Sequence, residues 1–183
     1  MNDKSSQIFS KIQFLIKEKQ FDHALQLMQV YDEDLKKNYL YFFYHGLINQ
    51  NTGLINEAIK CFKKTLALNP KHIVSYINLA QIYDENKDFT KSLENLKIAI
   101  ELDSTNEQII YLLARSYQKN NFDERAVFYF NKIKSNLKKN TVVLSLAKCH
   151  SKLKNYDEAI YHYEQYLRLE KKNISAYLSL GDL

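Results

Sequence analysis

The chain has 183 residues, of which 45% are hydrophobic, and its 26 basic and 21 acidic residues give a net charge of +5. Three glycines, one proline and no tryptophan argue against a turn-rich β protein and favour helices joined by short polar turns. The basic excess is mild and does not by itself select a class of partner.

Targeting signals are missing from the sequence as given. Residues 1–11 lack the basic-then-apolar order of a signal peptide. No stretch approaches the roughly 18 uninterrupted apolar residues of a membrane-spanning helix. Cys61 and Cys149 lie far apart and predict reduced, buried thiols rather than a disulfide. We therefore expect a cytoplasmic chain with no membrane span.

Two columns of small residues return every 33 or 34 residues. They are Ala24, Ala58, Ser92, Ala126 and Ala159, and Gly46, Ala80, Ala114, Ala147 and Gly181. A period of 34 selects a repeated helix–turn–helix unit. We therefore expect one solenoid over 1–183, with repeats at about 5–38, 39–72, 73–106, 107–139 and 140–173 and a partial sixth at 174–183.

The first repeat is degenerate. It keeps Phe21, Ala24 and Met28, but Ile12 stands where the first helix should carry a small residue. Terminal repeats are often atypical because they cap the stack. The second repeat follows the common pattern and closes with Asn69-Pro70, where the proline ends the second helix.

The third repeat shows the pattern most cleanly. One apolar stripe runs through Tyr76, Leu79, Ala80 and Tyr83, and a second begins at Phe89 after a polar turn at 86–88. These stripes predict two antiparallel helices that cross at Ala80 and at Ser92, where a large side chain would hold the backbones apart. Neither helix can bury its apolar face alone, so each pair must stack on the next.

The last repeats depart from the pattern in two places. The fourth is one residue short, and Phe122 lies four residues before Ala126 instead of three, so we expect a small adjustment at that turn. The sixth repeats the first-helix pattern and stops at Leu183. Its apolar residues lack a second helix to cover them, so we expect the native chain to continue. If it ends here, that face predicts a homodimer through the carboxyl-terminal end.

The motifs Tyr76-x-x-Leu79-Ala80-x-x-Tyr83 and Phe89-x-x-Ser92 resemble those of the tetratricopeptide repeat family. Tyr156-Asp157-Glu158-Ala159 followed by Tyr163 shows the same likeness, which extends over about 5–183. The resemblance implies an all-α fold, a right-handed α-solenoid of tandem helix–turn–helix repeats. It also implies a concave groove, lined by the first helix of each repeat, that usually binds a peptide or a partner helix.

On that family geometry, the groove takes the first-helix positions that do not pack within a repeat. These are Phe43, Leu47, Gln50, Ile77, Gln81, Asp84, Tyr111, Arg115, Gln118, Leu144, Lys148 and Ser151. The earlier positions are apolar and aromatic and the later ones basic, which predicts a protein or peptide partner with apolar anchors and acidic residues. In the alternative interpretation, Phe43, Ile77 and Tyr111 only complete the packing between repeats.

A run of lysines without any acidic residue lies between Ala126 and Asn155. Its members are Lys132, Lys134, Lys138, Lys139, Lys148, Lys152 and Lys154. We favour a solvated face over a nucleic-acid site, because the run has no arginine and its aromatic residues, 128–130, are consecutive. Bases stack on aromatic side chains set along a basic groove, and consecutive residues cannot share one helix face.

No catalytic, metal or cofactor site is predicted. The five histidines form no ligand pair at metal-binding spacing, and no phosphate-binding glycine loop or nucleophile elbow is present. The main hypothesis is a protein–protein interaction scaffold. The alternative is the amino-terminal recognition arm of a larger enzyme, of glycosyltransferase or sulfotransferase type, whose catalytic domain follows residue 183. A third, an assembly factor of a cilium, secretion or cell-cycle complex, rests on family habit alone.

Overall fold

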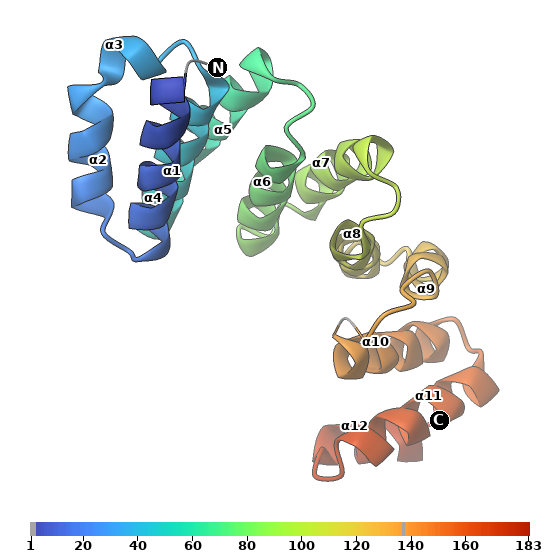
Figure 1. Ribbon diagram of the computed structural model, residues 1–183. Helices are drawn as coiled ribbons and strands as arrows, with labels where there is room; N and C mark the ends of the chain where they lie inside the picture. The colour runs from blue at the N-terminus through green and yellow to red at the C-terminus, as the bar shows by residue number, and fades with distance from the viewer. Residues whose placement is uncertain (1–2, 137) are drawn as a thin grey trace. The chain divides into compact units, whose positions relative to one another are not determined.

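The computed structural model describes residues 3–136 and 138–183, which form twelve α-helices and no strand. In chain order the helices are α1 (Asp3–Lys17), α2 (Phe21–Val30), α3 (Asp32–Leu35), α4 (Tyr39–Asn51), α5 (Ile55–Leu68), α6 (Ile73–Glu85), α7 (Phe89–Leu102), α8 (Glu107–Lys119), α9 (Asp123–Phe130), α10 (Lys139–Lys152), α11 (Tyr156–Leu169) and α12 (Ile174–Gly181) (Figure 1).

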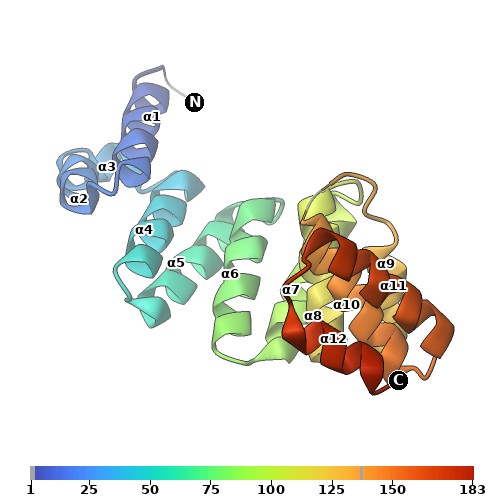
Figure 2. The ribbon, with the colours of Figure 1, turned by 90° about the horizontal axis from the view of Figure 1, so that it is seen from below.

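The chain divides into two compact units, Met1–Ile82 and Tyr83–Leu183, and the boundary lies within α6. In the first unit α1 packs along α2 and α4, and α4 packs along α5 (Figure 1). In the second unit each helix from α7 to α12 packs against the next, and α8 also contacts α10 (Figure 2). The single solenoid over the whole chain stays a prediction.

The small columns lie in the core, as the repeat pattern predicts. Every member of the second-helix column is at most 2% exposed. The members of the first-helix column from Gly46 to Ala147 are also buried. In the first repeat Ile12 stands at the equivalent position, and its side chain is 0% exposed. Gly181 is exposed. Within each unit, small residues therefore allow the paired helices to approach closely where they cross.

The turn within each repeat has one residue in the left-handed conformation. These residues are Lys19, Gly53, Lys87, Asn121 and Lys154, with φ between 57° and 82°. In each turn the amide of the following residue donates to a carbonyl five residues earlier, at 2.8–3.0 Å. This is the Schellman arrangement, which satisfies the last carbonyls of the first helix.

The expected adjustment at the turn of the fourth repeat is wrong. Asn121 has φ 59° and the Phe122 amide bonds to the Tyr117 carbonyl, as in the other turns. The second helix begins at Asp123, so Asp123 takes the place that Phe89 takes in the third repeat, and Phe122 stays 50% exposed. The fourth repeat differs from the third after this turn, in the length of its second helix: α9 has 8 residues, whereas α7 has 14.

The first repeat is atypical, as predicted, but in a way that its sequence pattern does not show. Its second helix, α2, has 10 residues, and the chain then turns at Tyr31 into the short helix α3. Leu35 at the end of α3 is fully buried. The first repeat therefore closes with an extra turn of helix that the other repeats lack within the described residues.

The apolar residues of α12 are only partly covered. Leu180 of α12 and Leu183, just beyond its end, pack against a cluster that contains Tyr163 and Leu167, so the prediction that they lack a cover is wrong for these two. Tyr177 is 52% exposed, in line with the prediction. Cys61 and Cys149 are free, as predicted, but only Cys149 is buried.

Candidate functional site

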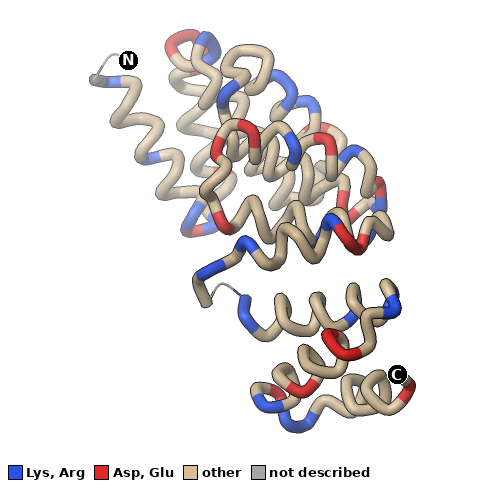
Figure 3. The backbone as a smooth tube through the Cα atoms, turned by 90° about the vertical axis from the view of Figure 1, so that its right-hand side faces the viewer, with Lys and Arg blue, Asp and Glu red and all other residues tan. Residues whose placement is uncertain are grey.

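A hollow of about 780 Å³ lies between α8 and α10, the first helices of the fourth and fifth repeats. It is lined by Tyr111, Arg115, Gln118, Lys119, Lys138, Thr141, Leu144, Ser145, Lys148 and Lys152, and we call it the α8–α10 groove. Five of these residues are basic and none is acidic. Figure 3 shows basic positions at the start of α10 and again toward its end.

Helical spacing brings the lining residues together. On α8, Arg115 and Lys119 follow Tyr111 at four and eight residues, so all three share one face. On α10, Leu144, Lys148 and Lys152 repeat the same spacing on the facing helix. Two parallel rows of side chains therefore meet across the groove.

The floor of the groove is aromatic and carries cations. Tyr111 is 1% exposed, and its ring lies 6.4 Å from that of Phe130 between centroids. The Lys138 Nζ lies 4.6 Å from the Tyr111 ring centroid, and the Arg115 guanidinium carbon lies 5.8 Å from it. Both distances allow cation–π attraction, which holds the two cations beside the floor.

Two of the five cations are already paired. The Lys119 Nζ lies 2.5 Å from an oxygen of Asp84, and the Lys152 Nζ lies 3.7 Å from one of Asp123. Arg115, Lys138 and Lys148 have no carboxylate partner among the described residues. These three give the groove an unbalanced positive charge that suits an acidic ligand.

A buried polar cluster supports one wall. The Gln118 amide donates to the Ser145 carbonyl at 3.2 Å and to the Cys149 sulfur at 3.3 Å, which ties α8 to α10. Burial, together with Asp123, raises the pKa of Cys149 to about 12, so this thiol stays protonated and unreactive. Asp123 is 7% exposed, and its Oδ1 has no hydrogen-bond partner in the described chain.

Five of the positions predicted for the groove line this hollow together. They are Tyr111, Arg115, Gln118, Leu144 and Lys148. Ser151 does not line it, and Asp84 bonds to Lys119 instead. Sequence reasoning missed Lys119, Lys138, Thr141, Ser145 and Lys152. Lys119 and Lys152 could have been found, since each follows a predicted cation by four residues.

The remaining predicted groove positions lie in the first unit and are not among the residues that line this hollow. Phe43 is 8% exposed, and its ring lies 4.6 Å from that of His72 and 6.1 Å from that of Phe62. Both partners belong to the second repeat, so these contacts pack within that repeat. The role of Phe43 in packing between repeats stays a prediction. Leu47, Gln50, Ile77 and Gln81 are half-buried.

Residues 3–136 and 138–183 contain no group of three or more histidine, cysteine, aspartate or glutamate side chains that could hold a metal ion. In the same residues, no helix combines the length and apolar character needed to cross a bilayer.

The repeats match a known family. The family model described as "Anaphase-promoting complex, cyclosome, subunit 3" matches residues 51–124 and 97–166, which together cover more than half of the chain. The chain belongs to this family, whose repeats are of the tetratricopeptide type. Proteins with this fold are generally protein–protein interaction scaffolds.

Relatives among characterised proteins are distant and much longer. Anaphase-promoting complex subunit 3 of Schizosaccharomyces pombe is 22% identical over 119 residues, which are 64% of this chain and 18% of that protein. Superkiller protein 3 of the same yeast is 24% identical over 144 residues, 74% of this chain and 10% of that protein. The chain thus spans less than a fifth of either relative.

Solved structures confirm the predicted fold class, an all-α tetratricopeptide solenoid. YrrB, titled "a TPR protein with an unusual peptide-binding site", has a TM-score of 0.82 at 13% identity and covers 98% of this chain and 92% of its own. MamA of Desulfovibrio magneticus RS-1 has a TM-score of 0.77 at 18% identity, with 95% and 99% covered.

Proposed function

We propose that this chain is a protein–protein interaction scaffold that binds an acidic segment of a partner protein in the α8–α10 groove. The observation that carries the proposal is the set of three cations, Arg115, Lys138 and Lys148, that surround an aromatic floor without a carboxylate partner in the described chain. A ligand carboxylate would supply the missing counter-charge.

The groove also offers apolar contact. Leu144 lies between the two lysine-bearing turns of α10 and is half-buried, so it can pack against an apolar side chain of the ligand. The volume of about 780 Å³ falls in the usual range for binding clefts of roughly 300–1,000 Å³. We infer a partner segment with one apolar anchor flanked by aspartate or glutamate.

Two features of the relatives support binding as the function. YrrB is titled as a peptide-binding tetratricopeptide protein, and the yeast subunit 3 is named as part of a multiprotein complex. No relative named above is a glycosyltransferase or a sulfotransferase, so the alternative of an enzyme's recognition arm gains no support. We also propose a cytoplasmic location, where the free thiols of Cys61 and Cys149 would stay reduced.

Fluorescence anisotropy with a labelled peptide of alternating leucine and glutamate tests the groove. The variant Arg115→Glu with Lys148→Glu should weaken binding by about tenfold or more, since it turns two attractive contacts into repulsive ones. Raising the salt concentration should weaken binding to the wild type in the same direction.

The control variant is Lys97→Glu with Lys172→Glu, two exposed positions outside the groove that give the same change in net charge. If both variants weaken binding equally, the peptide responds to overall charge and the groove assignment is wrong. Unchanged binding by the Arg115 and Lys148 variant also rejects it.

A further inference from the structure

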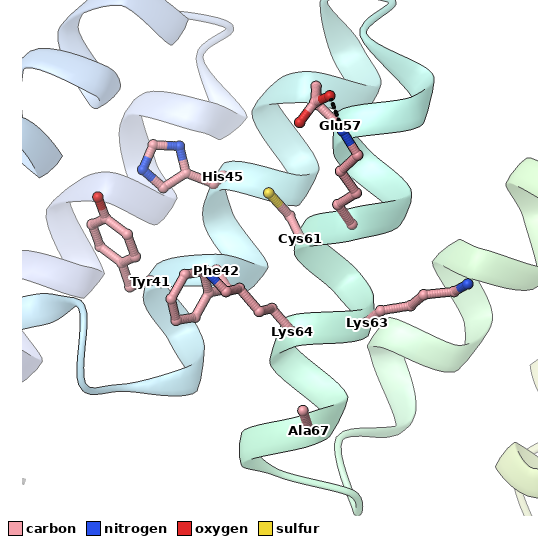
Figure 4. Close-up of a pocket in the computed structure, with 9 residues that line it drawn as sticks. Tyr41, Phe42, His45, Glu57, Cys61, Lys63, Lys64 and Ala67 are labelled. Carbon is pink, nitrogen blue, oxygen red and sulfur yellow. Dashed lines mark hydrogen bonds and ion pairs between the residues drawn. The ribbon is translucent and has the colours of Figure 1, made fainter.

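A second hollow, of about 650 Å³, lies between α4 and α5 in the first unit. Tyr41, Phe42 and His45 line it from α4, and Cys61 and Ala67 line it from α5 (Figure 4). We call it the α4–α5 hollow. Its surface is largely ring carbon, sulfur and methyl groups, so filling it with apolar side chains would remove apolar surface from water.

The aromatic side of the hollow, formed by Tyr41, Phe42 and His45, is fixed by contacts of its rings with one another and with α3. The Tyr41 hydroxyl donates to the Asp32 carboxylate at the start of α3. The Tyr41 ring lies 5.3 Å from that of Phe42 and 4.6 Å from that of His45, both edge to face. A wall fixed by such contacts costs little to order when a ligand binds.

The second helix of the first repeat is short and does not reach the hollow. Helices α5, α7 and α11 each have 14 residues, whereas α2 has 10 and the chain then bends away into α3. No residue of α2 or α3 lines the hollow. The first repeat is thus about one helical turn short of a full-length second helix, by roughly 3.6 residues per turn.

The rim of the hollow is basic. Lys60, Lys63 and Lys64 of α5 line it, and Glu57 is the one acidic residue among its lining. Glu57 is already bonded to Lys60, at 2.6 Å. The Lys64 Nζ lies 4.6 Å from the Phe42 ring centroid. Lys63 and Lys64 have no carboxylate partner among the described residues, so the rim complements an acidic ligand.

The length of the hollow fits a helix. Its lining on α5 runs from Glu57 to Ala67, which is about 15 Å at the helical rise of 1.5 Å per residue. An amphipathic helix presents its apolar side chains at positions i, i+3, i+4 and i+7, over a similar length.

We propose that the α4–α5 hollow is a second protein-binding surface, which takes an amphipathic acidic helix of a partner protein. The apolar face of that helix lies against Phe42 and Cys61, and its carboxylates face Lys63 and Lys64. This surface lies in the first unit and is independent of the α8–α10 groove, so a chain with both could hold two segments at once.

Cys61 provides a built-in reporter of occupancy. It lines the hollow and is half-buried, whereas Cys149 is 0% exposed and serves as an internal reference. The probe is a synthetic peptide of about twelve residues with leucines at helical spacing and glutamates between them. Iodoacetamide alkylation of the full chain is followed by mass spectrometry at about pH 9, because burial raises the pKa of the Cys61 thiol.

Saturating peptide should slow alkylation of Cys61 by about tenfold, since the bound helix would cover its sulfur. A peptide of the same composition with scrambled leucines should give no protection. The variant Lys63→Glu with Lys64→Glu should weaken the protecting peptide's affinity by about tenfold or more. Both lysines are exposed, so this variant keeps the core intact. Phe42→Ala should also weaken protection.

Four results would overturn the proposal. Cys61 could react equally fast with and without the peptide. Protection could survive the Lys63 and Lys64 variant. Protection could instead disappear in the Arg115→Glu, Lys148→Glu variant, which would show that the α4–α5 hollow does not bind the peptide independently of the α8–α10 groove. Protection of Cys61 that grows with protein concentration in the absence of peptide would identify a second copy as the occupant, which also rejects a partner helix.

Discussion

The ring of Phe62 closes over Gly46 so tightly that a Cβ atom at Gly46 would lie 2.7 Å from its Cε1 atom. Phe62 is fully buried, so its ring has no free space to retreat into. The glycine is therefore required by the crossing of α4 and α5. At the equivalent position of the sixth repeat, a Cβ on Gly181 would meet no atom within 4 Å.

This difference predicts opposite results for two identical substitutions. Gly46→Ala should lower the free energy of unfolding by about 1–3 kcal/mol, the usual cost of overpacking a core. Gly181→Ala should be neutral or raise it by up to about 1 kcal/mol, because alanine favours the helix. Urea denaturation of both variants measures the difference, and equal losses at the two positions would contradict it.

The left-handed residues of the turns predict a second pair of effects. Gly53 has φ 82° with no atom within 4 Å of an added Cβ, so Gly53→Ala should cost about 1 kcal/mol through backbone strain alone. Lys87 has φ 61° in the third repeat, and Lys87→Gly should relieve similar strain and gain about 0.5 kcal/mol. Thermal unfolding tests both, and a gain from Gly53→Ala would refute the argument.

His150 and His162 stack across α10 and α11, with ring centroids 5.5 Å apart and planes at 15°. Burial, and secondarily the charge on His150, holds the pKa of His162 below its ordinary value of 6.5, while Glu158 opposes this shift. As the pH falls below 6.5, the unfolded chain takes up a proton that folded His162 resists. Stability from this site is therefore present above that pH and is lost below it.

The variant His162→Phe should flatten the acid side of the pH–stability curve, because it removes the buried titrating nitrogen. His45 and His72 in the first unit also have pKa values lowered by burial, so part of the acid loss should remain. Denaturation at several pH values measures the slopes. His23→Phe, at an exposed position, is the control, and an equal change of slope in both variants would count against the stacked pair.

Lys152 and Asp123 predict an energetic coupling at the groove wall. Lys152→Met would leave the buried Asp123 carboxylate without its cation and should cost about 1–2 kcal/mol, since Lys152 is half-exposed and screened by water. In an Asp123→Leu background the same substitution should cost almost nothing. A double-mutant cycle by urea denaturation measures this coupling, and additive losses would show that the pair is not coupled.

The exposed apolar side chains of α12 predict self-association. Ile174, Tyr177 and Leu178 are 74%, 52% and 64% exposed on one short helix. Sedimentation velocity should show a mass that rises above 21.7 kDa with concentration, and Tyr177→Ser with Leu178→Ser should abolish the rise. Val30→Ser with Leu68→Ser changes two exposed apolar residues elsewhere and should leave it in place. A concentration-independent mass for the wild type would reject the prediction.

The helix pairs and their core were predictable because small residues at a crossing leave a periodic trace. The left-handed residues of the turns were not predictable, since lysine, glycine and asparagine all occupy these positions and share only a positive φ angle. The bond from Lys119 to Asp84 joins residues 35 apart, so it depends on how successive repeats stack. Lys138 reaches the Tyr111 ring from just before α10, outside any helical face. Such contacts leave no periodic pattern in the sequence.

The constant geometry of the turns has a consequence for exchanging repeats between proteins. The distance from the small residue of the first helix to that of the second is always twelve residues, including in the fourth repeat, where Ala114 and Ala126 keep it. The missing residue of the array lies after Ala126, in the connection to the next repeat. Chimaeras should therefore be joined in the connections between repeats, where a change in the number of residues is tolerated. The turn within each repeat should be transferred whole.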